Sequence, residues 1–152
     1  MRLTTQSEYA LVCLKALCLG TSNRPVSVTG IAAQENMSKD YVEQLFLKLK
    51  RAGIVYSVKG AHGGYVLSRE PGQITIREVI EALEGDIYEA FCSPDVREKI
   101  VCMHFSRCSL RPVWTKLQEI IDSYFSKITL ATLLKDEHAV AEELNLLAAK
   151  EG

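Results

Sequence analysis

The sequence predicts a mainly α-helical fold that carries one small β-hairpin. A mostly apolar stretch covers residues 5–19, and apolar residues recur at helical spacing between 42 and 49 and again between 113 and 128. Two short runs rich in β-branched and aromatic residues flank a glycine-rich turn at residues 59–64, which is typical of a hairpin. A chain of 152 residues can form one domain, or one small domain with an extension.

Three helices are expected in the first third of the chain. The first covers residues 5–19 and is followed by Gly20, a residue type that readily adopts the left-handed conformation after a helix. A short second helix covers residues 28–36. The third begins at Ser38, whose hydroxyl can cap the first turn, and ends near Gly53. Its inward stripe comprises Val42, Leu45, Phe46 and Leu49.

A hairpin and a C-terminal set of helices are expected to follow. The strands lie at residues 54–58 and 65–68, and Thr75 with Glu78 forms a capping box that opens a helix to about Leu83. A long amphipathic helix is expected at 112–127, a short helix after Thr129, and a weaker amphipathic stretch at 137–150. The chain thus divides into a domain at 1–85, a cysteine-bearing loop at 86–110, helices at 111–135 and a tail at 136–152.

This order of elements is that of a winged helix-turn-helix, in which one helix enters the major groove of DNA. The side chains expected to reach the bases come from the start of the third helix and are Ser38, Lys39, Asp40, Tyr41, Glu43 and Gln44. Gln44 can pair with adenine, and Glu43 can accept a hydrogen bond from cytosine. The alternative is a helix whose polar side is only exposed to solvent.

Basic side chains elsewhere in this domain are expected to contact the DNA backbone and the minor groove. Lys48 and Arg51, farther along the third helix, suit phosphates, which position a protein without specifying a sequence. Lys59 and His62 lie in the glycine-rich turn of the wing, which suits an adjacent minor groove.

Charge is distributed unevenly along a chain whose formal net charge is −1. Residues 1–72 contain nine Lys/Arg and five Asp/Glu, whereas residues 73–152 contain nine and fourteen. Only the first part therefore has a balance suited to phosphate. The N-terminus resembles no signal peptide, and no window is long and apolar enough to span a membrane, which predicts a cytoplasmic protein.

Three of the five cysteines, Cys92, Cys102 and Cys108, lie within one predicted loop. Thiolates are soft ligands that suit iron–sulfur clusters, zinc and copper(I). Spacing alone does not separate zinc from iron–sulfur, and ordinary free thiols are a further alternative. Cys13 and Cys18 lie within the apolar first helix, where we expect them to be small core residues.

Two motifs occur together in this chain, Tyr-x-Glu-Gln-Leu at residues 41–45 and Gly-x-x-Gly-Gly-Tyr at residues 60–65. With the opening Met1–Thr4, the segment Ile76–Gly85 and the later Ile128–Leu130, they resemble the IscR/NsrR/CymR family of bacterial transcriptional regulators over roughly residues 1–135. The resemblance implies a homodimer in which the long helix pairs with that of its partner. It also implies that Glu43 reads a base and that Lys59 contacts DNA from the wing, where many members have arginine.

Members of this family with three cysteines in the same loop bind an iron–sulfur cluster. The resemblance therefore implies that Cys92, Cys102 and Cys108 hold one, [2Fe–2S] rather than [4Fe–4S], although Cys92 is farther from the next cysteine than is usual. IscR-like members have a histidine three residues after the last cysteine, whereas this chain has Arg111. NsrR-like members use a carboxylate from the other subunit, and Glu8 occupies the matching position here. The implied fourth ligand is Glu8 of the partner subunit, with His104 as the alternative.

Other interpretations differ in what controls the protein or in what it does. One is a cluster-free repressor resembling CymR, controlled by a partner protein or by thiol oxidation. Another is a thiol or metal enzyme built from the loop cysteines, His104 and His138, but we find no Cys-His-Asn/Asp arrangement, phosphate loop or cofactor motif. A non-DNA adaptor would leave the basic wing unexplained. We expect operator DNA and a second copy of the chain as partners, with no membrane and no small-molecule substrate.

Overall fold

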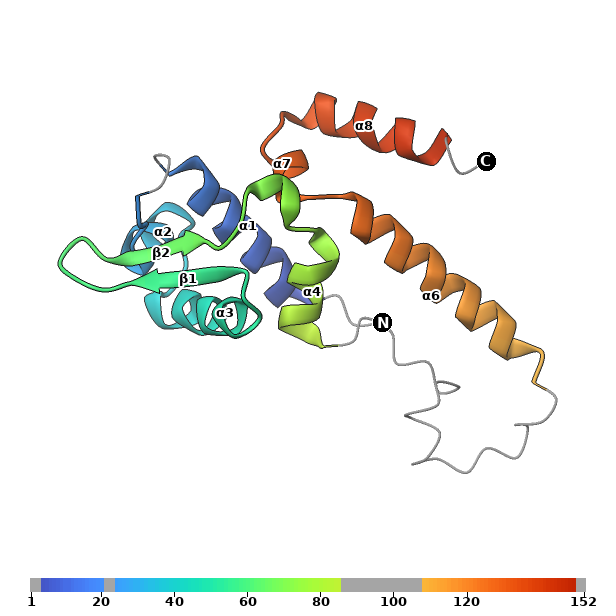
Figure 1. The fold of residues 1–152 in the computed structure, drawn as a ribbon, viewed down its shortest axis with the longest axis horizontal. Coiled ribbons are helices and arrows are strands. Elements are labelled where there is room, and N and C mark those ends of the chain that lie inside the picture. The colour runs from blue at the N-terminus through green and yellow to red at the C-terminus, as the bar shows by residue number, and fades with distance from the viewer. Residues whose placement is uncertain (1–3, 21–23, 86–107, 150–152) are drawn as a thin grey trace.

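A computed structural model describes residues 4–20, 24–85 and 108–149 and shows a mainly helical protein with a two-stranded hairpin (Figure 1). The first part comprises α1 (Thr5–Leu19), α2 (Val28–Gln34), α3 (Lys39–Arg51), β1 (Val55–Val58), β2 (Gly64–Leu67), the 3-10 turn η1 (Pro71–Gln73) and α4 (Ile76–Glu84). The second part comprises α6 (Leu110–Lys127), α7 (Leu130–Leu133) and α8 (Glu137–Ala149). The predicted fold class is confirmed. In the described ranges, no helix combines the length and apolarity that crossing a bilayer requires.

Side-chain caps determine where two functionally central helices begin. The Ser38 hydroxyl accepts a hydrogen bond from the Tyr41 backbone N–H at 3.3 Å, as predicted for the start of α3. Thr75 and Glu78 form the predicted capping box at the start of α4, because each side chain accepts a hydrogen bond from the other residue's backbone N–H. These bonds satisfy N–H groups that have no partner within the helix.

One hydrophobic core joins α1, α3 and α4 to the hairpin. The predicted stripe of α3 is buried in it, and Phe46 packs against Tyr65 of β2 with 4.7 Å between ring centroids. Burying a side chain such as Phe46 stabilises the fold by about 1.5–3 kcal/mol. Helix α3 is therefore anchored along one side, and the base of the hairpin is anchored on it.

The C-terminal end of α6 is joined to the first part of the chain by backbone hydrogen bonds. The Ile76 N–H donates to the Ile128 carbonyl at 2.8 Å, and the Leu130 N–H donates to the Ile74 carbonyl at 2.9 Å. Arg77 of α4 forms an ion pair with Asp122 of α6 at 3.6 Å. From this junction α6 extends away from α4 on the side of the molecule opposite the hairpin tip (Figure 1).

Several boundaries differ from the sequence-based expectation. Helix α2 ends at Gln34 rather than residue 36, because Asn36 has a φ of 51°, a left-handed conformation that asparagine tolerates. Gly20 has a φ of −59° and is not left-handed. A Cβ at that position would lie 2.6 Å from Val26 Cγ2, so space rather than conformation explains the glycine. Helix α6 begins two residues earlier than expected, at Leu110.

Candidate nucleic-acid interface

The N-terminal half of α3 presents polar side chains to solvent while its apolar stripe is buried. Four of the predicted base-reading residues are exposed along it: Lys39, Asp40, Glu43 and Gln44. The capping Ser38 is exposed beside them. A helix held in this way offers donors and acceptors of the kinds that pair with base edges in a major groove.

Tyr41 differs from its neighbours because its ring packs against α1. Its ring centroid lies 5.9 Å from that of Tyr9, and the two rings meet edge to face at 89°. Burial raises the pKa of the Tyr41 hydroxyl, and the neighbouring Tyr9 raises it further. In this arrangement the Tyr41 ring holds the first turn of α3 against α1.

Lys48 is directed toward the interior of the domain. Its ammonium donates to Gln6 Oε1 of α1 at 2.6 Å and to the Leu83 carbonyl of α4 at 3.3 Å. Arg51 remains exposed at the end of α3, whereas the Lys50 ammonium donates to the Ser57 hydroxyl of β1 at 2.7 Å. A phosphate contact by Lys48 would thus compete with two hydrogen bonds that tie α3 to α1 and α4.

The wing is the turn between β1 and β2, and it carries both predicted residues, Lys59 and His62, in exposed positions. Gly60 has a φ of +120°, and the Gly63 N–H donates to the Gly60 carbonyl at 2.9 Å, which closes the turn. A Cβ at Gly63 would lie 2.3 Å from the Val58 carbonyl oxygen, so only glycine fits there. The two basic residues therefore stand on a tight, preformed turn.

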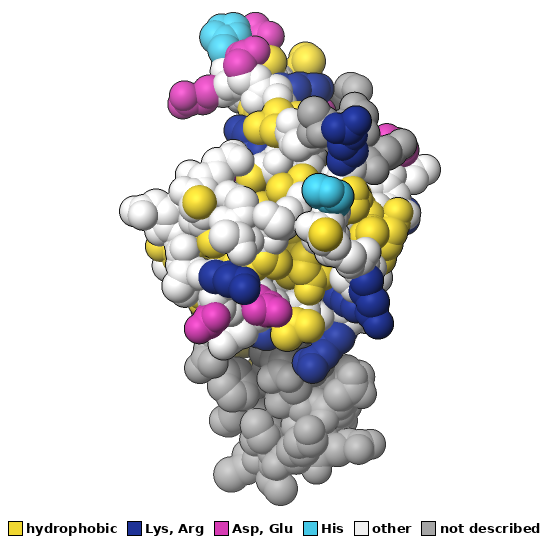
Figure 2. Space-filling view, turned by 90° about the vertical axis from the view of Figure 1, so that its left-hand side faces the viewer, with side chains coloured by type: hydrophobic (Ala, Val, Ile, Leu, Met, Phe, Trp, Pro, Cys, Tyr) yellow, Lys and Arg dark blue, Asp and Glu magenta, His cyan; other side chains and the backbone are white. Residues whose placement is uncertain are grey.

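Helix α3 and the wing belong to one side of the molecule. Figure 2 views the molecule from the side of the hairpin tip, and Lys and Arg side chains lie on both sides of an apolar centre. The Glu43 carboxylate is close enough to the wing base to influence Tyr65, whose pKa is raised by burial and further by that charge. A duplex seated on this side would meet base-reading groups and backbone-binding cations together.

Two of the predicted cluster ligands lie among the described residues. Cys108 is half-buried just before α6, and Glu8 is exposed in the first turn of α1. Both are accessible donors of the kinds a soft or borderline metal takes, a thiolate and a carboxylate. Cys92, Cys102 and His104 lie outside the described residues. Within the described ranges no three metal-binding side chains gather into one group.

The helix α1 cysteines are unsuited to ligation. Cys13 is fully buried, and burial, helped by the charge of Glu35, raises the pKa of its thiol to about 11. Its sulfur lies 3.8 Å from that of Met37. Cys18 is half-buried, and burial raises its pKa as well. Cys13 is a core residue as predicted, and Cys18 lies at the core's edge.

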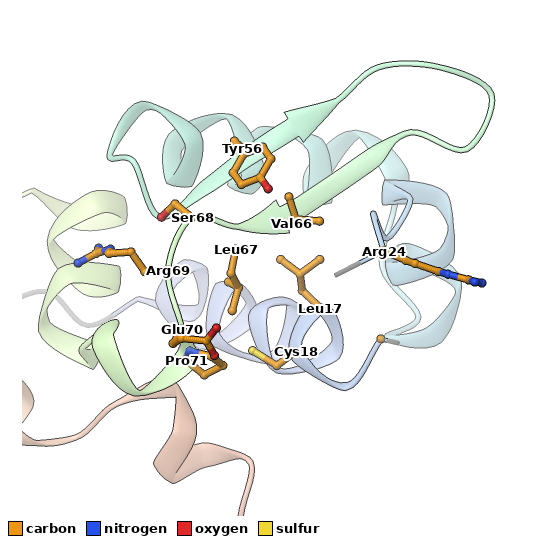
Figure 3. Close-up of a pocket in the computed structure, with 11 residues that line it drawn as sticks. Leu17, Cys18, Arg24, Tyr56, Val66, Leu67, Ser68, Arg69, Glu70 and Pro71 are labelled. Carbon is orange, nitrogen blue, oxygen red and sulfur yellow. The ribbon is translucent and has the colours of Figure 1, made fainter. Parts of the chain in front are cut away.

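Cys18 lines a cavity of about 520 Å³ between the end of α1 and the hairpin. Leu17, Tyr56, Val66 and Leu67 form its apolar wall, while the Arg24 side chain points away from it (Figure 3). Arg24 is not among the residues that the sequence predicts for the interface. Its position before Pro25, within the basic first half of the chain, was the available signal.

Comparisons with known proteins agree with this geometry. The family description "Rrf2: Iron-dependent Transcriptional regulator" matches residues 3–136. The HTH-type transcriptional regulator IscR of Xenorhabdus nematophila is 34% identical over 140 residues, covering 92% of this chain and 83% of that protein.

Two solved structures are similar over nearly the whole chain. CymR, the global cysteine regulator of B. subtilis, superimposes with a TM-score of 0.72 at 31% identity, covering 90% of this chain and 99% of that one. T. potens IscR superimposes with a TM-score of 0.67 at 33% identity, covering 90% and 88%. The chain is therefore similar to these proteins in its winged helix-turn-helix fold as well as in its sequence.

Proposed function

Because the chain belongs to the Rrf2 family of DNA-binding transcriptional regulators, we propose that it acts on its operator as a homodimer whose DNA affinity is set by an iron–sulfur cluster. DNA binding and regulation of transcription follow from the family itself, which consists of regulators and not enzymes. The dimer, the cluster and the contact residues are the proposed part.

The observation that carries the DNA-binding assignment is the orientation of α3. Its stripe from Val42 to Leu49 is buried, which leaves the polar N-terminal turns facing outward. We assign base reading to Glu43 and Gln44, with Ser38, Lys39 and Asp40 beside them. Lys59 and His62 would contact the adjacent minor groove from the wing.

A homodimer is supported by the surface of α6. Large apolar side chains at positions 113, 117, 120 and 124 follow one side of the helix and keep 37–57% of their surface exposed: Val113, Leu117, Ile120 and Tyr124. An apolar stripe of this length on a soluble protein marks an interaction surface. A second α6 in a two-fold arrangement would cover it, and two recognition helices would then address two half-sites.

For the cluster, Cys92, Cys102 and Cys108 would supply thiolates, and Glu8 of the partner subunit, or alternatively His104, the fourth ligand. A bound cluster, [2Fe–2S] in preference to [4Fe–4S], supplies a redox centre that oxidants or nitric oxide can modify. Cys108 directly precedes α6, and its carbonyl accepts a hydrogen bond from the Arg111 N–H at 3.3 Å. Holding this residue would therefore hold the start of the proposed dimer helix.

The DNA-binding proposal is tested by selecting duplexes from a random library with the full-length protein. Gln44→Ala or Glu43→Ala should relax the preference at one base pair per half-site, by about 1–3 kcal/mol. Lys116→Ala, a substitution on exposed α6, is the control and should leave the preference unchanged. Unaltered preferences in both α3 variants would refute the assignment of base reading.

The cluster proposal is tested by anaerobic purification, a visible spectrum, and iron and sulfide assays. Wild-type protein should be coloured and contain iron and sulfide, Cys108→Ser should lose both, and Glu8→Ala should lose its cluster faster. Glu137→Ala is a matched control, because Glu137 is also a carboxylate in the first turn of a helix. Colourless, iron-free protein that binds the operator would instead support a cluster-free regulator resembling CymR.

A further inference from the structure

A hollow of about 740 Å³ separates the segment before α2 from the wing turn. Its described lining comes from two short stretches, residues 24–27 and 61–63. Arg24 and His62 are the ionisable residues of this described lining, which contains no acidic residue. The hollow therefore has the chemistry of an anion site next to the wing.

The two walls of the hollow are joined by backbone hydrogen bonds. The Val26 N–H donates to the Tyr65 carbonyl at 3.0 Å, and the Tyr65 N–H donates to the Val26 carbonyl at 2.9 Å. A Cβ at Gly64 would lie 2.3 Å from the Val26 carbonyl oxygen, so the glycine permits this close pairing. Arg24, two residues before Val26, is thus carried by the same unit as the wing.

Arg24 differs from Arg69 and Arg77 in how its side chain is used. Arg69 donates to Glu78 at 2.9 Å, and Arg77 pairs with Asp122. Arg24 is exposed, and among the described residues none forms a hydrogen bond or ion pair with its guanidinium. Figure 3 shows it extended away from the cavity wall formed by Leu17 and Val66. Its charge is available to an external anion.

We propose that this hollow binds a backbone phosphate of operator DNA, with Arg24 as the anchor and His62 as a second donor. The inference rests on the proposed DNA binding and adds a contact residue to it. A guanidinium can hold a phosphate through two parallel hydrogen bonds, and an imidazole ring N–H can donate a third. Phosphate contacts fix orientation and register without reading sequence. The contact would position the wing on the duplex before Lys59 reaches the minor groove.

The test measures the dissociation constant of full-length protein for its library-selected duplex as a function of salt. Arg24→Ala should reduce the slope of log K against log salt by about 0.9 per chain, or about 1.8 for a dimer. It should weaken binding to the selected and a scrambled duplex by the same factor. Arg24→Lys keeps the charge without the paired geometry, so its dissociation constant should fall between those of wild type and Arg24→Ala. Because Arg24 is exposed, the melting temperature of Arg24→Ala should match that of wild type.

Lys116→Ala removes the same charge from α6, whose Lys116 side chain is 71% exposed, and should keep the wild-type slope. An Arg24→Ala slope equal to that of Lys116→Ala would overturn the phosphate site while leaving the proposed function intact. Failure of wild type to select any duplex would instead overturn the proposed function itself, and the phosphate site with it.

Discussion

The carboxylate of Glu84, in the last turn of α4, accepts a hydrogen bond from the Ser7 hydroxyl of α1 at 2.7 Å. The same oxygen accepts hydrogen bonds from the backbone N–H and the hydroxyl of Thr4. Lys48 of α3 binds Gln6 and the Leu83 carbonyl next to it. The recognition helix, the start of α1 and the end of α4 therefore meet in one polar junction.

Removing the charge of Glu84 should make the free energy of unfolding less dependent on pH. Burial alone raises its pKa, but the hydrogen bonds from Thr4 and Ser7 and the charge of Lys48 outweigh burial and hold the pKa below its ordinary value of 4.5. A carboxylate with a lowered pKa stabilises the fold above 4.5, and this contribution is lost as the pH falls below that value. Glu84→Gln should cost about 1 kcal/mol at pH 7 and flatten the acid side of the stability profile, measured by urea unfolding. Glu81→Gln, on the exposed side of α4, is the control; an identical effect there would contradict the prediction.

Lys48→Met should weaken DNA binding indirectly. The substitution keeps the aliphatic stem but leaves Gln6 Oε1 and the Leu83 carbonyl without their donor, which should lower stability by about 1–2 kcal/mol. The salt dependence of DNA binding should stay at its wild-type slope, since the ammonium is engaged inside the domain. A slope reduced by about 0.9 per chain would show that Lys48 contacts phosphate after all.

Gly64→Ala should destabilise the wing. The added Cβ would lie 2.3 Å from the Val26 carbonyl oxygen and force apart the strand and the segment paired with it. We expect a loss of about 1–3 kcal/mol in urea unfolding and weaker DNA binding. Gly72→Ala is a matched control, because its Cβ would meet only the Ala131 Cβ at 3.9 Å. Equal stability of the two variants would argue against the pairing.

Leu117→Asp should separate the proposed dimer into single chains. The charge would have to be buried if the exposed apolar stripe of α6 meets a second copy, and an unpaired buried charge is costly. Thr115→Asp places the same charge about half a turn away on α6 and should leave the assembly intact. Analytical ultracentrifugation distinguishes the two masses. A wild-type protein that sediments as a single chain at micromolar concentration would contradict the dimer.

The features that sequence patterns predicted are those that depend on neighbouring residues. The Ser38 cap and the Thr75–Glu78 capping box each involve residues three apart, so their spacing was readable. The hairpin was similarly marked by its glycines. The partners of Lys48 and Glu84 lie 42 and 77 residues away, and no local pattern reports them. This is why the sequence pointed Lys48 only toward a phosphate and gave no sign of its hydrogen bonds to Gln6 and the Leu83 carbonyl.

Long-range contacts also explain two glycines and the position of the wing, and no local pattern could predict these. Gly20 and Gly64 are required by the approach of Val26, a contact set by the folded chain and not by the turn in which each glycine lies. The pairing of Val26 with Tyr65 likewise joins two segments that the sequence shows only as separate. Arg24 gains its place beside the wing through that pairing.

The junction of Ile128 with Ile76 makes α6 a lever with one pinned end. Its eighteen residues span about 27 Å, so a tilt of about 5° that hardly displaces Ile128 moves the opposite end by roughly 2 Å. That opposite end is Leu110, two residues from Cys108. A displacement at Leu110 is therefore passed along α6 to Ile128, where the helix joins α4.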